Sequence, residues 1–88
     1  YIESQGHTLI LHTILGDYET SGTMKEMEEK LKGMNFCRGN KGYLINLQHV
    51  ERIQDGCALV KGENLTLSRA RRKVFMEALT RYWGEVIK

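Results

Sequence analysis

The chain has 88 residues, of which 41% are hydrophobic and 27% charged, and its formal net charge is +2. This length allows one small domain, and the composition is that of a globular protein rather than a disordered tail. No apolar run approaches the roughly 20 residues of a membrane span, so we expect no membrane partner, and the slight basic excess alone does not indicate nucleic-acid binding. Cys37 and Cys57 are far apart and are expected to be free thiols in a reducing, cytoplasmic setting.

The first third of the chain predicts strands followed by a short helix. Residues 1–3 have the pattern of a strand end, and residues 7–14 and 18–20 predict a hairpin that turns at Gly16. The stretch Thr23-Met24-Lys25-Glu26 fits a capping box, which predicts an amphipathic helix over about 23–32. The outer face of this helix is rich in charge, as solvated helix faces usually are.

The middle of the chain predicts further strands around one polar segment. Residues 36–42 read FCRGNKG, and we expect a loop there, followed by a strand over 43–45. Asn46 is expected to cap a single helical turn. The remaining predicted strands lie at residues 51–53, 57–60 and 65–67, with a turn at Asp55-Gly56.

The last part of the chain predicts the longest helix, over about 69–83. Ser68 is suited to the N-cap, an apolar stripe follows at helical spacing, and Gly84 is expected to end the helix. Four of the first five helical residues are basic, namely Arg69, Arg71, Arg72 and Lys73. These side chains either keep an outer face solvated or, together with the positive end of the helix dipole, bind a polyanion.

The 36–42 loop has two interpretations of the same kind. It is either a plain turn or a contact surface in which Arg38, Asn40 and Lys41 face phosphates or base edges. In the second interpretation, Gly39 and Gly42 let the backbone approach a partner closely.

We predict that the chain is not an enzyme and carries no cofactor or metal. It contains no nucleophile or phosphate-loop motif, and its three histidines lack metal-ligand spacing. His12 is expected to be a packed or surface residue rather than a ligand.

Three segments of the chain resemble one family. The stretch FCRGNKGYLINLQHVERI (36–53) resembles the central signature of LytTR-type DNA-binding domains, and LTLSRARRKVF (65–75) resembles their second signature. The opening YIESQGHTLILHT (1–13) is similar to the family's first segment. The resemblance implies a mainly β fold, with small antiparallel sheets in an elongated arrangement and short helices. It also implies that loops between strands, rather than a recognition helix, enter successive major grooves of double-stranded DNA.

The resemblance assigns roles to single residues. His7 and Lys41 match base-reading positions, whereas Arg38 and Asn40 match positions near the DNA backbone. Arg69 matches the family's Ser-Arg arginine, and the next position, where some members place a base-contacting arginine, is Ala70 here. Arg71 or Arg69 is expected to take over that contact, with Arg72 and Lys73 on phosphates.

The resemblance further implies the output domain of a bacterial response regulator. We expect residues 1–88 to be one such domain, which lacks its first strand and is cut from a longer regulator. That regulator is expected to have an N-terminal receiver domain that is controlled by a sensor kinase. Two copies are expected to bind repeated half-sites. The alternative is a protein-interaction or ligand-sensing β-domain that uses the acidic helix 23–32.

Overall fold

The computed structural model describes residues 1–87, which form eight strands, two α-helices and one 3-10 turn. In chain order the elements are β1 (Ile2–Gln5), β2 (Thr8–Thr13), β3 (Gly16–Ser21), α1 (Met24–Lys30), β4 (Phe36–Asn40), β5 (Tyr43–Asn46), η1 (Leu47–His49), β6 (Val50–Gln54), β7 (Cys57–Val60), β8 (Glu63–Thr66) and α2 (Arg69–Val86). The predicted class, mainly β with two helices, is confirmed.

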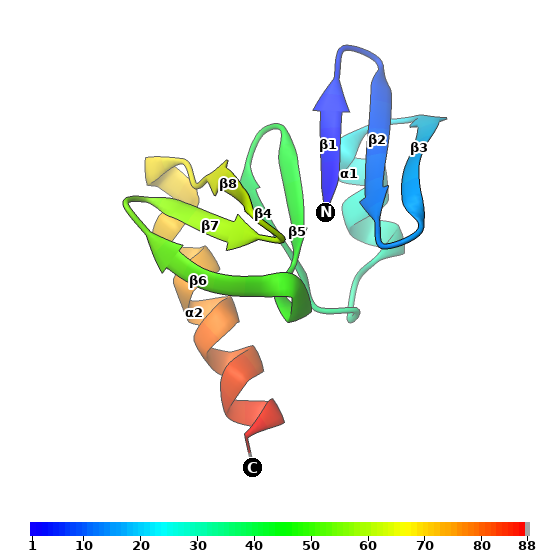
Figure 1. Ribbon diagram of the computed structural model, residues 1–88. Helices are drawn as coiled ribbons and strands as arrows, with labels where there is room; N and C mark the ends of the chain where they lie inside the picture. The colour runs from blue at the N-terminus through cyan, green and yellow to red at the C-terminus, as the bar shows by residue number, and fades with distance from the viewer. Residues whose placement is uncertain (88) are drawn as a thin grey trace.

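The strands form two antiparallel sheets, one of five strands in the order β3-β2-β1-β5-β4 and one of three in the order β6-β7-β8. In Figure 1, α1 lies behind the first sheet, and α2 lies behind the second sheet and extends below it. The described chain measures 36 × 25 × 24 Å with a radius of gyration of 12.5 Å. This radius is close to the ~12 Å of a compact domain of this length, so the elongation is moderate.

Two hydrophobic cores lie on opposite sides of β5. Ile45 belongs to the larger core, in which Phe75 and Leu79 of α2 pack on the second sheet. Its neighbour Leu44 belongs to the smaller core, between the first sheet and α1. Successive side chains of a strand point to opposite faces, so β5 contributes to both cores.

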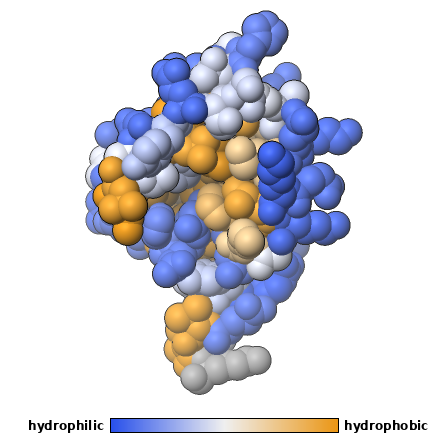
Figure 2. Space-filling model, turned by 90° about the vertical axis from the view of Figure 1, so that its right-hand side faces the viewer, coloured by the Kyte–Doolittle hydropathy of each residue, from blue (hydrophilic) through white to orange (hydrophobic). Residues whose placement is uncertain are grey.

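The smaller core is open on one side. A groove of about 310 Å³ runs beside α1, and its apolar lining includes Leu11, Met27 and Phe36. Figure 2 shows hydrophobic side chains gathered in a hollow on this side of the molecule, between hydrophilic margins.

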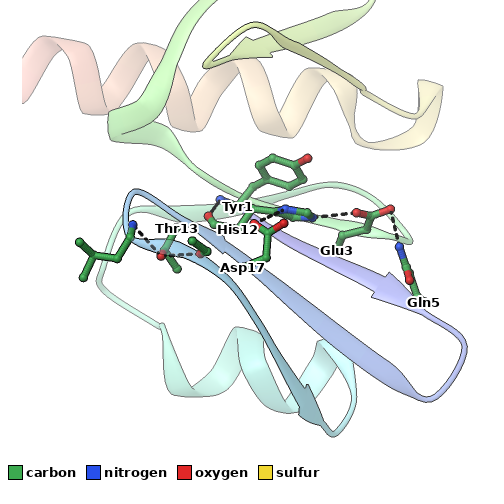
Figure 3. Close-up of polar contacts among 8 residues, drawn as sticks. Tyr1, Glu3, Gln5, His12, Thr13 and Asp17 are labelled. Atoms are coloured by element: carbon green, nitrogen blue, oxygen red, sulfur yellow. Dashed lines mark hydrogen bonds and ion pairs between the residues drawn. The ribbon is translucent and has the colours of Figure 1, made fainter.

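A polar cluster holds β1, β2 and β3 together at the end near the β2–β3 turn (Figure 3). The His12 ring nitrogens lie 2.8 Å from Oε1 of Glu3 and 3.0 Å from Oδ1 of Asp17. The ring also stacks on Tyr1, with centroids 4.4 Å apart. His12 is therefore a packed residue, as predicted, and it can donate to both carboxylates only when both ring nitrogens carry hydrogen.

The helix boundaries differ from the prediction in two places. The capping box at Thr23 is present, and α1 begins at Met24 as expected but ends at Lys30. α2 continues through Gly84 to Val86, so the prediction that this glycine ends the helix is wrong. One glycine costs only about 1 kcal/mol in a helix, too little to stop it. Ser68 occupies the N-cap position but makes no side-chain capping bond.

The segment 36–40 is a strand, not the predicted loop. β4 pairs with β5 in an antiparallel hairpin whose register shifts between Arg38 and Asn40. Gly39, at this irregularity, is buried, and a Cβ there would lie 2.7 Å from Cδ1 of Ile45 and 3.0 Å from Cδ2 of Leu67. The prediction that Gly39 faces a partner is therefore wrong, because it faces the larger core.

Candidate nucleic-acid interface

Three segments that contain predicted DNA-binding residues lie along one side of the molecule. These are the β1–β2 turn, the β4–β5 turn and the start of α2, which occupy the upper side of Figure 1. Backbone hydrogen bonds link them, since Ser4 N donates to Gly42 O over 2.9 Å and Ser68 N donates to Gly39 O over 2.8 Å. The β4–β5 hairpin thus lies between the other two and is bonded to both.

Lys41 is the exposed side chain at the tip of this hairpin. Its neighbour Asn40 is used internally, because its Nδ2 donates to the carbonyl of Thr66 over 2.6 Å. The Oδ1 atom of Asn40 accepts from the backbone N–H of Gly42 over 2.7 Å. Asn40 therefore closes the turn and links it to the end of β8, shortly before the start of α2.

Arg38 is also held within the protein. Its Nη1 donates to Oε1 of Glu28 on α1 over 2.6 Å, and the Arg38 side chain is only 13% exposed. Its Nε donates to the carbonyl of Asn40 over 3.3 Å, and its Nη2 donates to the carbonyl of Lys41 over 3.5 Å. The guanidinium supports the tip of the hairpin from below.

The start of α2 presents several cations to solvent. Arg69, Arg72 and Lys73 are exposed, and Ala70 is exposed between Arg69 and the half-buried Arg71. In the described part of the chain, none of the four cations forms an ion pair with a carboxylate; the ion pairs there involve His12 and Arg38. Their positive charge is therefore uncompensated by local pairs, which favours binding of an anion at the helix N-terminus.

Two of these basic residues contact other elements. A Cβ built at Gly56 would lie 2.7 Å from Nη2 of Arg72, so the guanidinium covers the β6–β7 turn. Arg71 lines a cavity of about 390 Å³ with Cys37 and Arg38. Burial raises the pKa of the Cys37 thiol, while the positive charge of Arg71 opposes that shift.

The structure thus divides the predicted site residues into two groups. The residues of the first group, in the β1–β2 turn, the β4–β5 turn and the start of α2, are the exposed His7, Lys41, Arg69, Arg72 and Lys73 and the half-buried Arg71. Arg38 and Asn40 are brought to the same place, but their polar groups are used in internal bonds. Glu28 was missed, because its position in the sequence marks it only as part of a solvated helix face.

Some of the glutamates of the acidic helix α1 make hydrogen bonds within the protein. Glu26 closes the capping box with Thr23, and this hydrogen bonding lowers the pKa of the Glu26 carboxyl. Glu28 pairs with Arg38. Two of the three glutamates of α1 therefore have internal partners, which weakens the case for a contact surface built on its acids.

Within residues 1–87, no helix is long and apolar enough to cross a membrane. The same residues contain no group of three or more His, Cys, Asp or Glu side chains placed to hold a metal ion. Cys37 and Cys57 are both unpaired.

Two small antiparallel sheets that present a basic turn and a basic helix start on one side define a β-domain of the nucleic-acid-binding class. Residues 1–80 match the family model described as the LytTr DNA-binding domain, and the chain belongs to this family of DNA-binding domains. A curated relative is the sensory transduction protein LytT of Oceanobacillus iheyensis, which is 38% identical over 50 residues. The matched stretch covers 56% of this chain and 20% of that relative, so the chain corresponds to a minor part of the relative's length.

Proposed function

We propose that this domain recognises a specific double-stranded DNA sequence by placing the β1–β2 turn, the β4–β5 turn and the start of α2 in successive major grooves. The observation that carries the proposal is that these three segments lie on one side, tied together by the bonds Ser4–Gly42 and Ser68–Gly39. Segments joined by backbone hydrogen bonds keep their relative positions, so they can meet one face of a duplex in a fixed register.

The exposure of each residue supports a distinct role. Lys41 is at the tip of the hairpin and can reach guanine O6 and N7, and His7 is exposed in the first turn. Near α2, Arg69 or Arg71 takes the base contact that Ala70 cannot make. Arg72 and Lys73 hold phosphates, which set affinity and register rather than sequence preference.

For Arg38 and Asn40 we now propose a supporting role in place of the direct DNA contacts that the resemblance implies. Their donors already bond to protein groups, and a phosphate would have to displace Glu28 or the Thr66 carbonyl. Groups that hold a contact loop in one geometry improve recognition, because the loop then loses less conformational entropy when it binds.

We further propose that the domain is the output part of a cytoplasmic response regulator that controls transcription. In the intact regulator, a receiver domain would be joined to this domain, and a sensor kinase would act through the receiver. Two copies would bind repeated half-sites one or two helical turns apart, as dimeric readers do.

The test is selection of bound duplexes from a random pool, followed by a salt titration on the enriched sequence. We expect a repeated motif and a fall in log K against log salt with a slope of about −2 for each bound domain, because Arg72 and Lys73 each neutralise one phosphate. Failure to enrich any sequence, with no salt-dependent binding to any duplex, would exclude DNA reading and favour the protein-interaction alternative.

A further inference from the structure

We infer that Glu28 on α1 is a positioning residue for the β4–β5 turn, and that it acts on this turn through Arg38. The inference rests on the proposed function, because it concerns how the DNA-facing tip is held.

The contact between the two side chains is short and partly shielded from solvent. Nη1 of Arg38 lies 2.6 Å from Oε1 of Glu28, with 13% of the arginine side chain and 40% of the glutamate side chain exposed. A charge-assisted hydrogen bond of this length is stronger than a neutral one. The pair joins two elements, since α1 and β4 have no hydrogen bond in common through their backbones.

The rest of the guanidinium is directed at the tip of the hairpin. Nε and Nη2 of Arg38 donate to the carbonyls of Asn40 and Lys41, the two residues that lead into the turn. Because a guanidinium is rigid and planar, fixing Nη1 on Glu28 also fixes the donors that face these carbonyls. The position of the Glu28 carboxylate therefore helps to fix the position of the Lys41 backbone.

α1 is a firm support for this contact. Met24 is buried in the smaller core, and Met27 and Leu31 pack against it. The capping box between Thr23 and Glu26 fixes the start of the helix. Glu28 therefore lies on a helix that is itself packed firmly against the first sheet.

Glu28 has an electrostatic effect as well. Its carboxylate neutralises Arg38, so that Lys41 is the unpaired cation at the tip. Without Glu28, the freed guanidinium would attract phosphates of any sequence, and the tip would lose its support. Loss of Glu28 should therefore raise affinity for random DNA and lower discrimination between DNA sequences.

The experiment compares Glu28→Gln with Glu29→Gln. Both changes raise the net charge by one unit on the same helix, but Glu29 is exposed and has no side-chain partner in the described structure. For each variant, the ratio of Kd on random duplex to Kd on the selected duplex is measured well below the melting temperature. We expect the ratio to fall about fivefold in Glu28→Gln and to stay near the wild-type ratio in Glu29→Gln, as for the loss of one partly exposed charge-assisted contact.

Arg38→Lys provides a second, independent variant. Lysine keeps the charge and can reach Glu28, but it lacks the fork that bonds to the two carbonyls. We expect its selectivity to fall because the tip loses its support. Adding Glu28→Gln should then lower selectivity only through the freed positive charge, and so by less than Glu28→Gln does in the wild type. If Glu28→Gln does not fold, Arg38→Lys decides: reduced selectivity supports the inference and unchanged selectivity overturns it.

The outcomes separate the two levels of the proposal. A wild-type protein that prefers no duplex would overturn the proposed function and this inference together. A selective wild type with equal ratios for Glu28→Gln and Glu29→Gln would overturn the inference alone.

Discussion

Replacing Gly39 by alanine tests whether the β4–β5 hairpin is built into the larger core. The added Cβ would lie 2.7 Å from Cδ1 of Ile45 and 3.0 Å from Cδ2 of Leu67, whereas carbon atoms in contact prefer about 3.5–4.0 Å. Both neighbours must move by roughly 0.5–1 Å to reach that distance. Ile45 is completely buried and Leu67 is 1% exposed, so neither can move into solvent.

The size of the effect follows from two opposing contributions. Overpacking a core typically costs about 1–3 kcal/mol. Replacing glycine by alanine in a strand returns about 0.5–1 kcal/mol, because the unfolded chain loses conformational freedom. We therefore expect Gly39→Ala to lower the free energy of unfolding by about 1–2 kcal/mol, which corresponds to a fall in Tm of roughly 4–16 °C for a domain of this size.

Gly42→Ala is the matched control in the same hairpin. Its nearest foreign atom would be Oδ1 of Asn40 at 3.5 Å, an ordinary contact, so we expect a change within about 0.5 kcal/mol. Urea unfolding with equal slopes for all proteins would give the comparison. If Gly39→Ala were as stable as Gly42→Ala, our description of β4 as a strand packed on Ile45 and Leu67 would be wrong.

Four other changes give direct tests. Lys41→Ala should weaken the binding free energy for the selected duplex by about 1–3 kcal/mol and relax the base preference at one position of the site. An unchanged base preference in a repeated selection would disprove the role of the tip. Arg72→Ala should weaken binding to all duplexes alike and reduce the salt slope by about 1, in contrast to a loss confined to one sequence. Thr23→Ala should lower the free energy of unfolding by about 1 kcal/mol, since Thr23 Oγ1 accepts from Glu26 N, and a neutral result would remove the cap from our account. Hydrogen bonds to Thr23 lower the pKa of the Glu26 carboxyl from 4.5, so the stabilisation by Glu26 is complete above that pH and disappears as pH falls through the folded-state pKa. The urea midpoints of wild type and Glu26→Gln should therefore differ at pH 7 and converge as the pH falls well below 4.5.

Local signals in the sequence were sufficient to predict several elements. The capping box placed the start of α1 at Met24, and Asn46 caps η1 by accepting from Gln48 N over 3.0 Å, as expected. The β6–β7 turn was marked by Asp55-Gly56. Each of these features depends on residues within a few positions of one another, where side-chain chemistry determines backbone geometry directly.

The errors at β4 and at Ser68 arose where distant residues decide the structure. The polar composition of residues 36–40 indicates a loop, but their pairing with β5 and the packing of Gly39 on Leu67 make them a strand. Ser68 lacks a side-chain cap, and its own N–H bonds to Gly39, twenty-nine positions earlier. Periodicity and turn signals do not contain such contacts.

The candidate site shows the same division. The exposed cations and the family resemblance were evident from the sequence, and the chain does belong to the LytTr DNA-binding domain family. The internal hydrogen bonds of Arg38 and Asn40 could not be predicted from the sequence, because their partners Glu28 and Thr66 lie on other elements of the fold. The sequence thus indicated which residues are basic, but not which of their side chains are available to contact a partner.

The position of β5 between two cores has a consequence for how the domain unfolds. Leu44 and Ile45 are adjacent in the chain, yet each completes a different core. Detaching β5 would therefore remove a buried side chain from both cores at once. We therefore expect the two sheets to unfold as one cooperative unit, so that a destabilising substitution in one core also lowers the stability of the other.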